Sequence, residues 1–167
     1  SFVDAHPEGT VFQSPEMYAL FEGSERMKPV VVGAMNESTG RLEGILLAVI
    51  IREMTGLAGY FSSRAVIYGG PLVGKRGRGE EEKRGRREDG KIYDILIEEL
   101  IRQVKDKSVF IQFRNFSSQE DSKDIFLNKG FKFRERLNLI VDTKNLETVK
   151  RNMSESRLRQ IRQGLGR

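Results

Sequence analysis

The sequence contains no cysteine, no tryptophan and a single histidine, His6. Disulfide bonds, thiolate metal sites and a cysteine nucleophile are therefore excluded. A serine–histidine–acid triad cannot be assembled around one histidine that lies beside Pro7 in an expected loop. We expect His6 to be exposed to solvent and to take no part in catalysis. The longest apolar run, residues 44–51, is far shorter than the roughly 20 residues of a membrane-spanning helix.

The composition is typical of a globular domain with a well-hydrated surface. Of the 167 residues, 38% are hydrophobic and 32% are charged. This length fits one ordinary domain that can bury a core without cross-links. No signal-peptide pattern opens the chain, and we expect a cytoplasmic location. The chain begins with Ser1 and ends in basic residues typical of a helix, so we expect it to be part of a longer protein.

The net charge of +5 is unevenly distributed. Residues 75–91 hold eight basic and five acidic residues, and residues 150–167 hold six basic residues and one acidic residue. The rest of the chain is mildly acidic. This distribution argues against a whole face built for nucleic acid and favours local contact with phosphates or RNA. A solvated loop and a solvated linker are alternatives that the sequence does not exclude.

Apolar periodicity and turn residues together predict an α/β domain with a mixed, largely antiparallel sheet flanked by helices. Ser14 and Pro15 predict the start of a first helix, because serine caps helices and proline favours the first helical position. The ranges that we expect to be strands are 30–32, 41–52, 60–68, 109–113 and 131–142. The turn residues of Asn36 to Gly40 predict that the first two strands form an antiparallel hairpin, and 109–113 is typical of a buried strand. The expected helices are 16–22, 91–104, 121–129, 145–152 and 155–163. Apolar residues from Ile92 to Val104 form a stripe along one helix face, and Gly130 is expected to close the helix 121–129 with a positive φ angle. We expect residues 1–13 to be irregular and residues 74–90 to form a mobile charged loop.

The third expected strand ends at Gly69-Gly70-Pro71. Glycine permits positive φ angles, and proline removes a backbone hydrogen-bond donor. Tyr68, Gly69 and Gly70 are candidate substrate-binding residues, because glycines let the backbone approach a ligand closely. A strand-ending turn that needs glycine for its geometry explains the motif equally well.

The basic C-terminal segment supplies the other binding candidates, Arg157, Arg159 and Arg162. If this segment is helical, Arg159 and Arg162 are three residues apart and lie near one face. These arginines either bind phosphate or RNA, or simply keep an interdomain helix solvated.

Four segments, read in order, resemble the first domain of the Fem family: TVFQSP at 10–15, IYGGPL at 67–72, LNLIVD at 137–142 and MSESRLRQIR at 153–162. The helix–glycine–aromatic–strand pattern of residues 125–131 also resembles the closing unit of the acetyltransferase-like (GNAT-like) fold. Members of the Fem family move amino acids from charged tRNA to the peptide stem of peptidoglycan precursors, and they build this domain twice. The resemblance implies an acetyltransferase-like fold and an aminoacyltransferase function.

The same resemblance implies the organisation and the partners of the protein. Residues 1–150 would form the first domain, and residues 151–167 a basic helix or linker that leads to a second GNAT-like domain. The implied partners are aminoacyl-tRNA, a UDP-linked or lipid-linked muramyl-peptide, and that second domain. The implied chemistry requires no cofactor and no metal. No catalytic residue is assigned, and we expect this chain to be inactive without the second domain.

An acetyl-CoA-dependent N-acetyltransferase is the alternative enzyme. Such enzymes hold the coenzyme A pyrophosphate on a glycine-rich loop before a helix. The loop here contains Gly77-Arg78-Gly79, but Gly74 stands where Gln or Arg is typical, and residues 80–82 are acidic. The next expected helix begins at Lys91, too far away for its dipole to help. We therefore expect no coenzyme A, and a non-catalytic binding module of the same fold is a further alternative.

Overall fold

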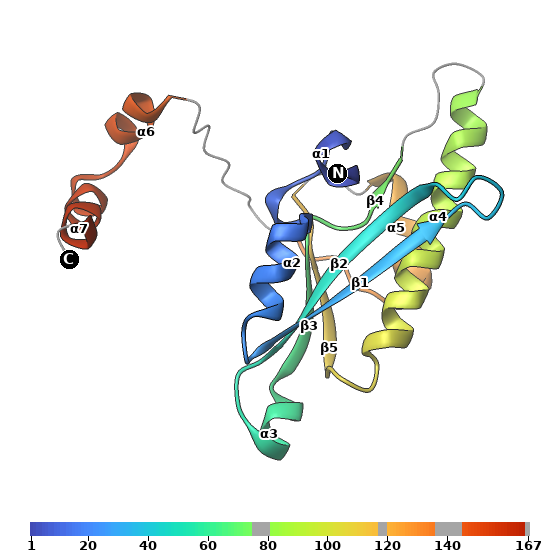
Figure 1. The fold of residues 1–167 in the computed structure, drawn as a ribbon, viewed down its shortest axis with the longest axis horizontal. Coiled ribbons are helices and arrows are strands. Elements are labelled where there is room, and N and C mark those ends of the chain that lie inside the picture. Colours follow the sequence, from blue (N-terminus) through green and yellow to red (C-terminus); the bar gives the residue numbers. More distant parts are fainter. Residues whose placement is uncertain (75–80, 117–119, 136–144, 166–167) are drawn as a thin grey trace. The chain divides into compact units, whose positions relative to one another are not determined.

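The computed structural model describes residues 1–74, 81–116, 120–135 and 145–165. These residues form two compact units, Ser1–Lys132 and Phe133–Arg167. All the described strands belong to the first unit (Figure 1).

The first unit is built on a mixed β-sheet with the strand order β1-β2-β3-β5. β1 (Met27–Met35), β2 (Leu42–Arg52) and β3 (Ser63–Tyr68) are antiparallel neighbours, whereas β5 (Phe110–Arg114) is parallel to β3. The short strand β4 (Leu72–Val73) pairs with β2 beyond the end of β3. The predicted fold class, a mixed and largely antiparallel sheet flanked by helices, is therefore confirmed.

Asn36 and Gly40 encode the hairpin that joins β1 to β2. The side-chain oxygen of Asn36 accepts hydrogen bonds from the backbone N–H groups of Ser38 and Thr39, both at 3.0 Å. Gly40 has a φ angle of +65°, which glycine adopts without steric cost. The hairpin that the sequence predicts is therefore present, and local chemistry explains it.

Helix α4 (Glu81–Val104) covers one face of the sheet (Figure 1). Its predicted apolar stripe packs against alternate residues of β1, β2 and β3 to form the larger core. Several members of this core are completely inaccessible to solvent: Leu46, Ala48, Ala65, Ile67, Leu96, Leu100 and Val104. Since full burial of one such leucine or isoleucine stabilises the fold by about 1.5–3 kcal/mol, this face is a major source of stability.

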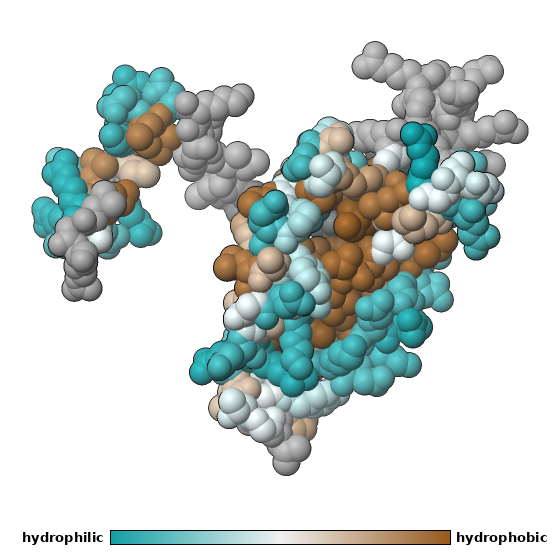
Figure 2. Space-filling model, viewed as in Figure 1, coloured by the Kyte–Doolittle hydropathy of each residue, from teal (hydrophilic) through white to brown (hydrophobic). Residues whose placement is uncertain are grey.

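Helix α2 (Pro15–Glu22) lies on the opposite face. Its N-cap is Ser14, as predicted, and the Ser14 hydroxyl accepts a hydrogen bond from the Met17 N–H at 3.3 Å. Phe21 of α2 packs in a smaller core with Leu47, Val49 and Val66. Figure 2 shows that apolar residues also gather on this side of the sheet beside α2.

The start of α4 differs from the sequence-based expectation. Residues 81–90, expected in a mobile loop, form the first turns of the helix. Their Glu, Lys and Arg residues have high helix propensity, which explains the helix without an apolar period. Residues 75–80 of the expected loop lie outside the described residues.

Three short helical segments were not predicted. Residues 60 and 61, expected to begin a strand, instead end helix α3 (Gly56–Phe61). Helix α1 (Phe2–Ala5) and the 3-10 helix η1 (Val11–Gln13) occupy the lead-in that was expected to be irregular. These segments are too short to show an apolar period, and capping side chains, such as those of Ser1 and Asp4, stabilise α1.

The region from β5 onwards contains one helix that was predicted and two expected strands that differ from the prediction. Helix α5 (Lys123–Asn128), preceded by the 3-10 helix η2 (Glu120–Ser122), is followed by Gly130 at a φ angle of +83°, as expected. β5 was expected to be a buried strand, but Phe110 is 52% exposed because β5 lies at the edge of the described sheet. Within the expected strand 131–142, residues 131–135 have no regular structure and the others lie outside the described residues.

The described part of the second unit contains two helices, α6 (Leu146–Asn152) and α7 (Glu155–Leu165). The Asn145 side chain caps α6 by accepting hydrogen bonds from the N–H groups of Glu147 and Thr148, both at 3.1 Å. The Ser154 hydroxyl accepts the Arg157 N–H at 3.4 Å at the start of α7. Both helices were predicted from the sequence.

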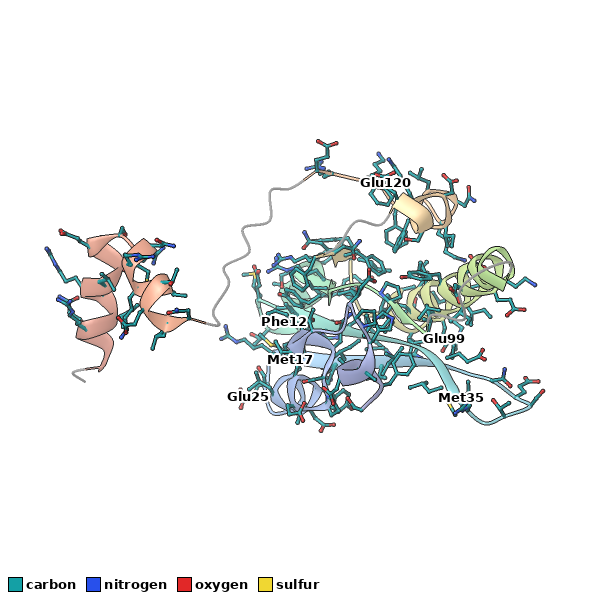
Figure 3. All side chains as sticks on the ribbon, turned by 90° about the horizontal axis from the view of Figure 1, so that it is seen from above. Phe12, Met17, Glu25, Met35, Glu99 and Glu120 are labelled. Atoms are coloured by element: carbon teal, nitrogen blue, oxygen red, sulfur yellow. The ribbon has the colours of Figure 1, made fainter. Side chains whose placement is uncertain are left out.

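The pKa of Glu99 gives a test of the local structure of α4 (Figure 3). Hydrogen bonds from Arg102 and then Gln103 lower the Glu99 pKa from 4.5 to about 2. Because the folded-state pKa is depressed, the stabilisation is present above pH 4.5 and is lost as the pH falls towards 2. We predict that an NMR titration finds the depressed pKa and that Arg102→Ala returns it towards 4.5. A Glu99 pKa that the substitution leaves unchanged would contradict this structure.

Candidate functional site

The carboxyl ends of the parallel strands β3 and β5 lie side by side at one end of the sheet (Figure 1). Tyr68 pairs with Arg114 at the last position of both strands. The next residue extends the contact, because the Gly69 N–H donates to the Arg114 carbonyl at 2.9 Å. In open α/β sheets, ligands bind outside the carboxyl ends of parallel strands. This end of the sheet is therefore the candidate site.

Gly69 and Gly70 turn the chain away from β3 with φ angles of +89° and +76°. The buried side chain of Gln13 donates to the Gly70 carbonyl at 2.9 Å and accepts from the N–H and hydroxyl of Thr10 at 3.0 and 2.9 Å. A Cβ at Gly69 would lie 2.8 Å from the Gln13 amide, and a Cβ at Gly70 would lie 2.8 Å from Asn115 Oδ1. Both glycines are thus required by the turn and by its packing, and a role in substrate binding stays a prediction.

Aromatic side chains lie next to this turn. Phe12 stacks on Tyr68 with a centroid distance of 5.3 Å, and its ring centroid lies 5.6 Å from that of Phe116. Phe12, labelled in Figure 3, is 36% exposed and Phe116 is 40% exposed, so both present ring surface to solvent. An apolar surface next to backbone groups suits a ligand that carries both an apolar part and a carbonyl.

Arg114 adds positive charge to the same place. Its guanidinium carbon lies 5.4 Å from the centroid of the Tyr68 ring, within the range of a cation–π contact. Its Nη2 makes only a long hydrogen bond of 3.4 Å to Gln112, and its buried Nε has no hydrogen-bond partner among the described residues. A guanidinium with weakly used donors is well suited to bind a carboxylate, phosphate or carbonyl oxygen.

His6 was expected to be exposed to solvent, and this expectation is wrong. The ring is half-buried, with Nε2 2.9 Å from the Val73 carbonyl and Nδ1 3.1 Å from the Glu8 nitrogen. Because Nδ1 accepts a hydrogen bond from the Glu8 N–H, the ring hydrogen is on Nε2, which donates a hydrogen bond to the Val73 carbonyl. His6 therefore fastens the N-terminal segment to β4.

The arginine candidates lie in the second unit. Arg157, Arg159 and Arg162 are exposed on α7, and Arg157 donates to Gln160 Oε1 at 3.2 Å. The two sets of sequence candidates thus belong to different units. A contact between these arginines and a substrate stays a prediction.

Sequence reasoning did not identify four residues of the candidate site: Phe12, Gln13, Arg114 and Phe116. Phe12 and Gln13 lie within the first Fem-like segment, which was a usable signal. Arg114 and Phe116 carry no local signal, because only the pairing of β5 with β3 brings Arg114 to Tyr68 and Phe116 to the neighbouring Phe12.

Metal binding and membrane insertion were also assessed. In the described ranges, no group of three or more His, Cys, Asp or Glu residues could hold a metal ion. None of the helices described is long and apolar enough to cross a membrane.

Comparisons with known proteins found similarity in structure but not in sequence. No protein-family model matches the chain, and no curated protein matches it. An acetyltransferase from Trypanosoma brucei is 19% identical, with a TM-score of 0.48 over 68% of each chain. A probable acetyltransferase is 14% identical, with a TM-score of 0.44 over 68% of this chain and 69% of the other. A Pyrococcus furiosus protein named as a provisional acetyltransferase is 18% identical, with a TM-score of 0.45 over 76% of this chain and 73% of the other.

These likenesses concern the arrangement of helices and strands, and identities this low say nothing about activity. The chain has an α/β fold, in which α4 crosses from β3 to the parallel strand β5. No comparison supports the Fem family in particular.

The contact between Gly69 and Gln13 can be tested against a matched glycine. Gly69→Ala and Gly40→Ala both place a side chain at positive φ, which costs about 1–2 kcal/mol. The new Cβ at Gly69 also meets Gln13, whereas nothing lies within 4 Å of a Cβ at Gly40. We predict that, in urea unfolding, the free energy of unfolding falls more for Gly69→Ala than for Gly40→Ala, by about 1–3 kcal/mol.

A second background identifies the cause. In the Gln13→Ala variant, the cost of Gly69→Ala should fall to that of Gly40→Ala, because the obstructing amide is gone. If Gly69→Ala lowers the stability equally with and without Gln13, the close approach of the Gln13 amide is not the reason that position 69 requires glycine.

Proposed function

We propose that the protein is an acyltransferase whose first unit contributes a substrate site at the carboxyl ends of β3 and β5. The observation that carries this proposal is the convergence of Tyr68, Arg114 and the Gly69–Gly70 turn at that edge. Acyl transfer to an amine needs positioned reactants and hydrogen-bond donors for the developing oxyanion. It needs neither a metal nor a covalent nucleophile, which agrees with a chain that has no cysteine.

In this proposal, the donor is aminoacyl-tRNA and the acceptor is an amine of a peptidoglycan precursor in the cytoplasm. The four Fem-like segments support this choice. Two of them, 10–15 and 67–72, are far apart in sequence but meet through the hydrogen bond from Gln13 to Gly70. A second GNAT-like domain completes the catalytic site, so this chain is inactive without it.

The residues have separate roles in this scheme. Tyr68, Gly69 and Gly70 contact the muramyl-peptide acceptor, and Arg114 binds one of its carbonyl or anionic oxygens. The aromatic rings beside them limit the access of water, which strengthens these hydrogen bonds. The exposed arginines 157, 159 and 162 contact tRNA phosphates.

An acetyl-CoA-dependent N-acetyltransferase is a second candidate, and one observation favours it. Helix α4 begins at Glu81, with only Glu80 between it and Gly77-Arg78-Gly79 in the sequence, and not at Lys91 as expected. The distance argument against a pyrophosphate at this helix therefore no longer holds. The acidic residues 80–82 and the glycine at position 74 still argue against coenzyme A.

Thermal unfolding with each ligand tests the two candidates. A ligand that binds only the folded state stabilises it by about 2.7 kcal/mol at 100 times its dissociation constant. We predict that a UDP-linked muramyl-pentapeptide raises the unfolding midpoint of this chain and that acetyl-CoA does not. A shift with acetyl-CoA alone would favour the second candidate. No shift with either ligand would show that the first unit does not hold the acceptor.

A matched pair of arginine variants locates the binding site. Arg114→Gln should abolish the shift that the muramyl-peptide produces, because it removes the cation beside Tyr68. Arg102→Gln makes the same change on the exposed surface of α4 and should leave the shift intact. Equal shifts in both variants would place the acceptor elsewhere.

A further inference from the structure

The end of the sheet opposite the candidate site carries exposed apolar side chains. Met54, Tyr60 and Phe61 lie on the connection between β2 and β3, and 59%, 43% and 77% of their surface is exposed. Figure 1 shows that α3, within this connection, projects beyond the strands. Single exposed apolar residues are ordinary, but a group of them on a projecting turn marks a contact surface.

Hydrogen bonds hold this connection in a defined conformation. The Met54 N–H donates to the Ser62 hydroxyl, which in turn donates to the Gly59 carbonyl, both at 3.2 Å. The rings of Tyr60 and Phe61 meet edge to face with their centroids 5.6 Å apart. The exposure of these side chains is therefore a property of a folded turn.

A second connection adds apolar residues at the same end. Val109 and Phe110, each 52% exposed, follow the turn between α4 and β5. The Val109 N–H donates to the Ser63 carbonyl at 3.0 Å, and Phe110 pairs with Arg64 in the sheet. The two connections are thus neighbours, and together they form the apolar end: Met54, Tyr60, Phe61, Val109 and Phe110.

Basic side chains border the apolar end. Arg52 and Arg26 are exposed and adjacent, because the Arg52 N–H donates to the Arg26 carbonyl at 3.0 Å. Lys105 and Lys107 are exposed on the turn that leads to Val109. Cations therefore lie beside both connections.

The acidic residues at this end do not cancel that charge. Glu53 is engaged by Arg64 at 2.7 Å. Glu25 and Asp106 are exposed beside the four basic side chains named above. The border of the apolar end therefore carries a net positive charge.

We propose that the apolar end docks on an anionic lipid surface. Apolar and aromatic side chains that project from a turn insert at the boundary between headgroups and acyl chains, and basic neighbours bind anionic headgroups. A lipid surface deforms to receive a projecting end, whereas a protein partner would need a matching pocket. This inference goes beyond the proposed function and does not depend on it.

Docking in this way orients the candidate site. β3 runs from the apolar end to Tyr68, and its six residues span about 20 Å at about 3.3 Å per residue. The candidate site would therefore face away from the lipid surface and remain open to solvent. Lipid binding and ligand binding can then be measured independently.

Vesicle sedimentation of the 167-residue chain tests the proposal. We expect binding to vesicles of phosphatidylcholine mixed with phosphatidylglycerol, and weak or no binding to phosphatidylcholine alone. Met54→Ser combined with Phe61→Ser should lower the partition coefficient by about tenfold or more, because insertion is lost. Lys105→Gln combined with Lys107→Gln should weaken binding to the anionic vesicles and reduce its salt dependence.

Met35→Ser is the matched control. Met35 is 58% exposed, close to the 59% of Met54, but it lies at the hairpin end of β1 (Figure 3). It should therefore leave vesicle binding unchanged, and thermal melts of each variant verify the fold. Absence of vesicle binding by the native chain would overturn the proposal. Equal losses of vesicle binding for Met35→Ser and for the single variant Met54→Ser would overturn it as well. Self-association that Phe61→Ser abolishes, without vesicle binding, would instead identify a protein interface and overturn it too.

Discussion

The parallel pairing of β3 with β5 is the constraint on which the rest of the first unit depends. Two parallel strands cannot be joined by a tight turn, so the chain has to cross over a face of the sheet, and α4 is that crossover. The crossover packs Leu96 and Leu100 into the larger core. It also brings the carboxyl ends of β3 and β5 to one edge. The same connection therefore builds the core and positions Tyr68 beside Arg114.

A single buried amide couples the N-terminal segment to that edge. Gln13 is 3% exposed, and a buried amide has to be hydrogen-bonded because water cannot satisfy it. Its partners are Thr10 before α2 and Gly70 after β3, so it fixes the separation between the two segments. This explains why the turn has no room for a side chain at Gly69. The geometry of the candidate site thus depends on an N-terminal segment that contains only the short helices α1 and η1.

The sequence predicts those features that neighbouring residues determine. The Asn36–Gly40 turn and the Ser14 cap depend on contacts within a few residues, and the apolar stripe of residues 92–104 is a local period. The long-range contacts of His6 with Val73 and of Gln13 with Gly70 leave no comparable signal. The first turns of α4 were missed for a related reason, because charged residues without an apolar period look like a loop. Tyr68, Gly69 and Gly70 were recognised from turn chemistry, whereas Arg114 joins them only through strand pairing.

The start of α4 also changes the basis on which the two acyl donors are distinguished. Because α4 begins at Glu81 and not at Lys91, distance no longer argues against a pyrophosphate at the start of this helix. The sequence, however, has acidic residues at all three positions 80–82. Negatively charged residues repel a pyrophosphate at short range. Charge, and not distance, therefore argues against coenzyme A. The exposed arginines of α7 make a phosphate-rich donor such as tRNA compatible with the same chain.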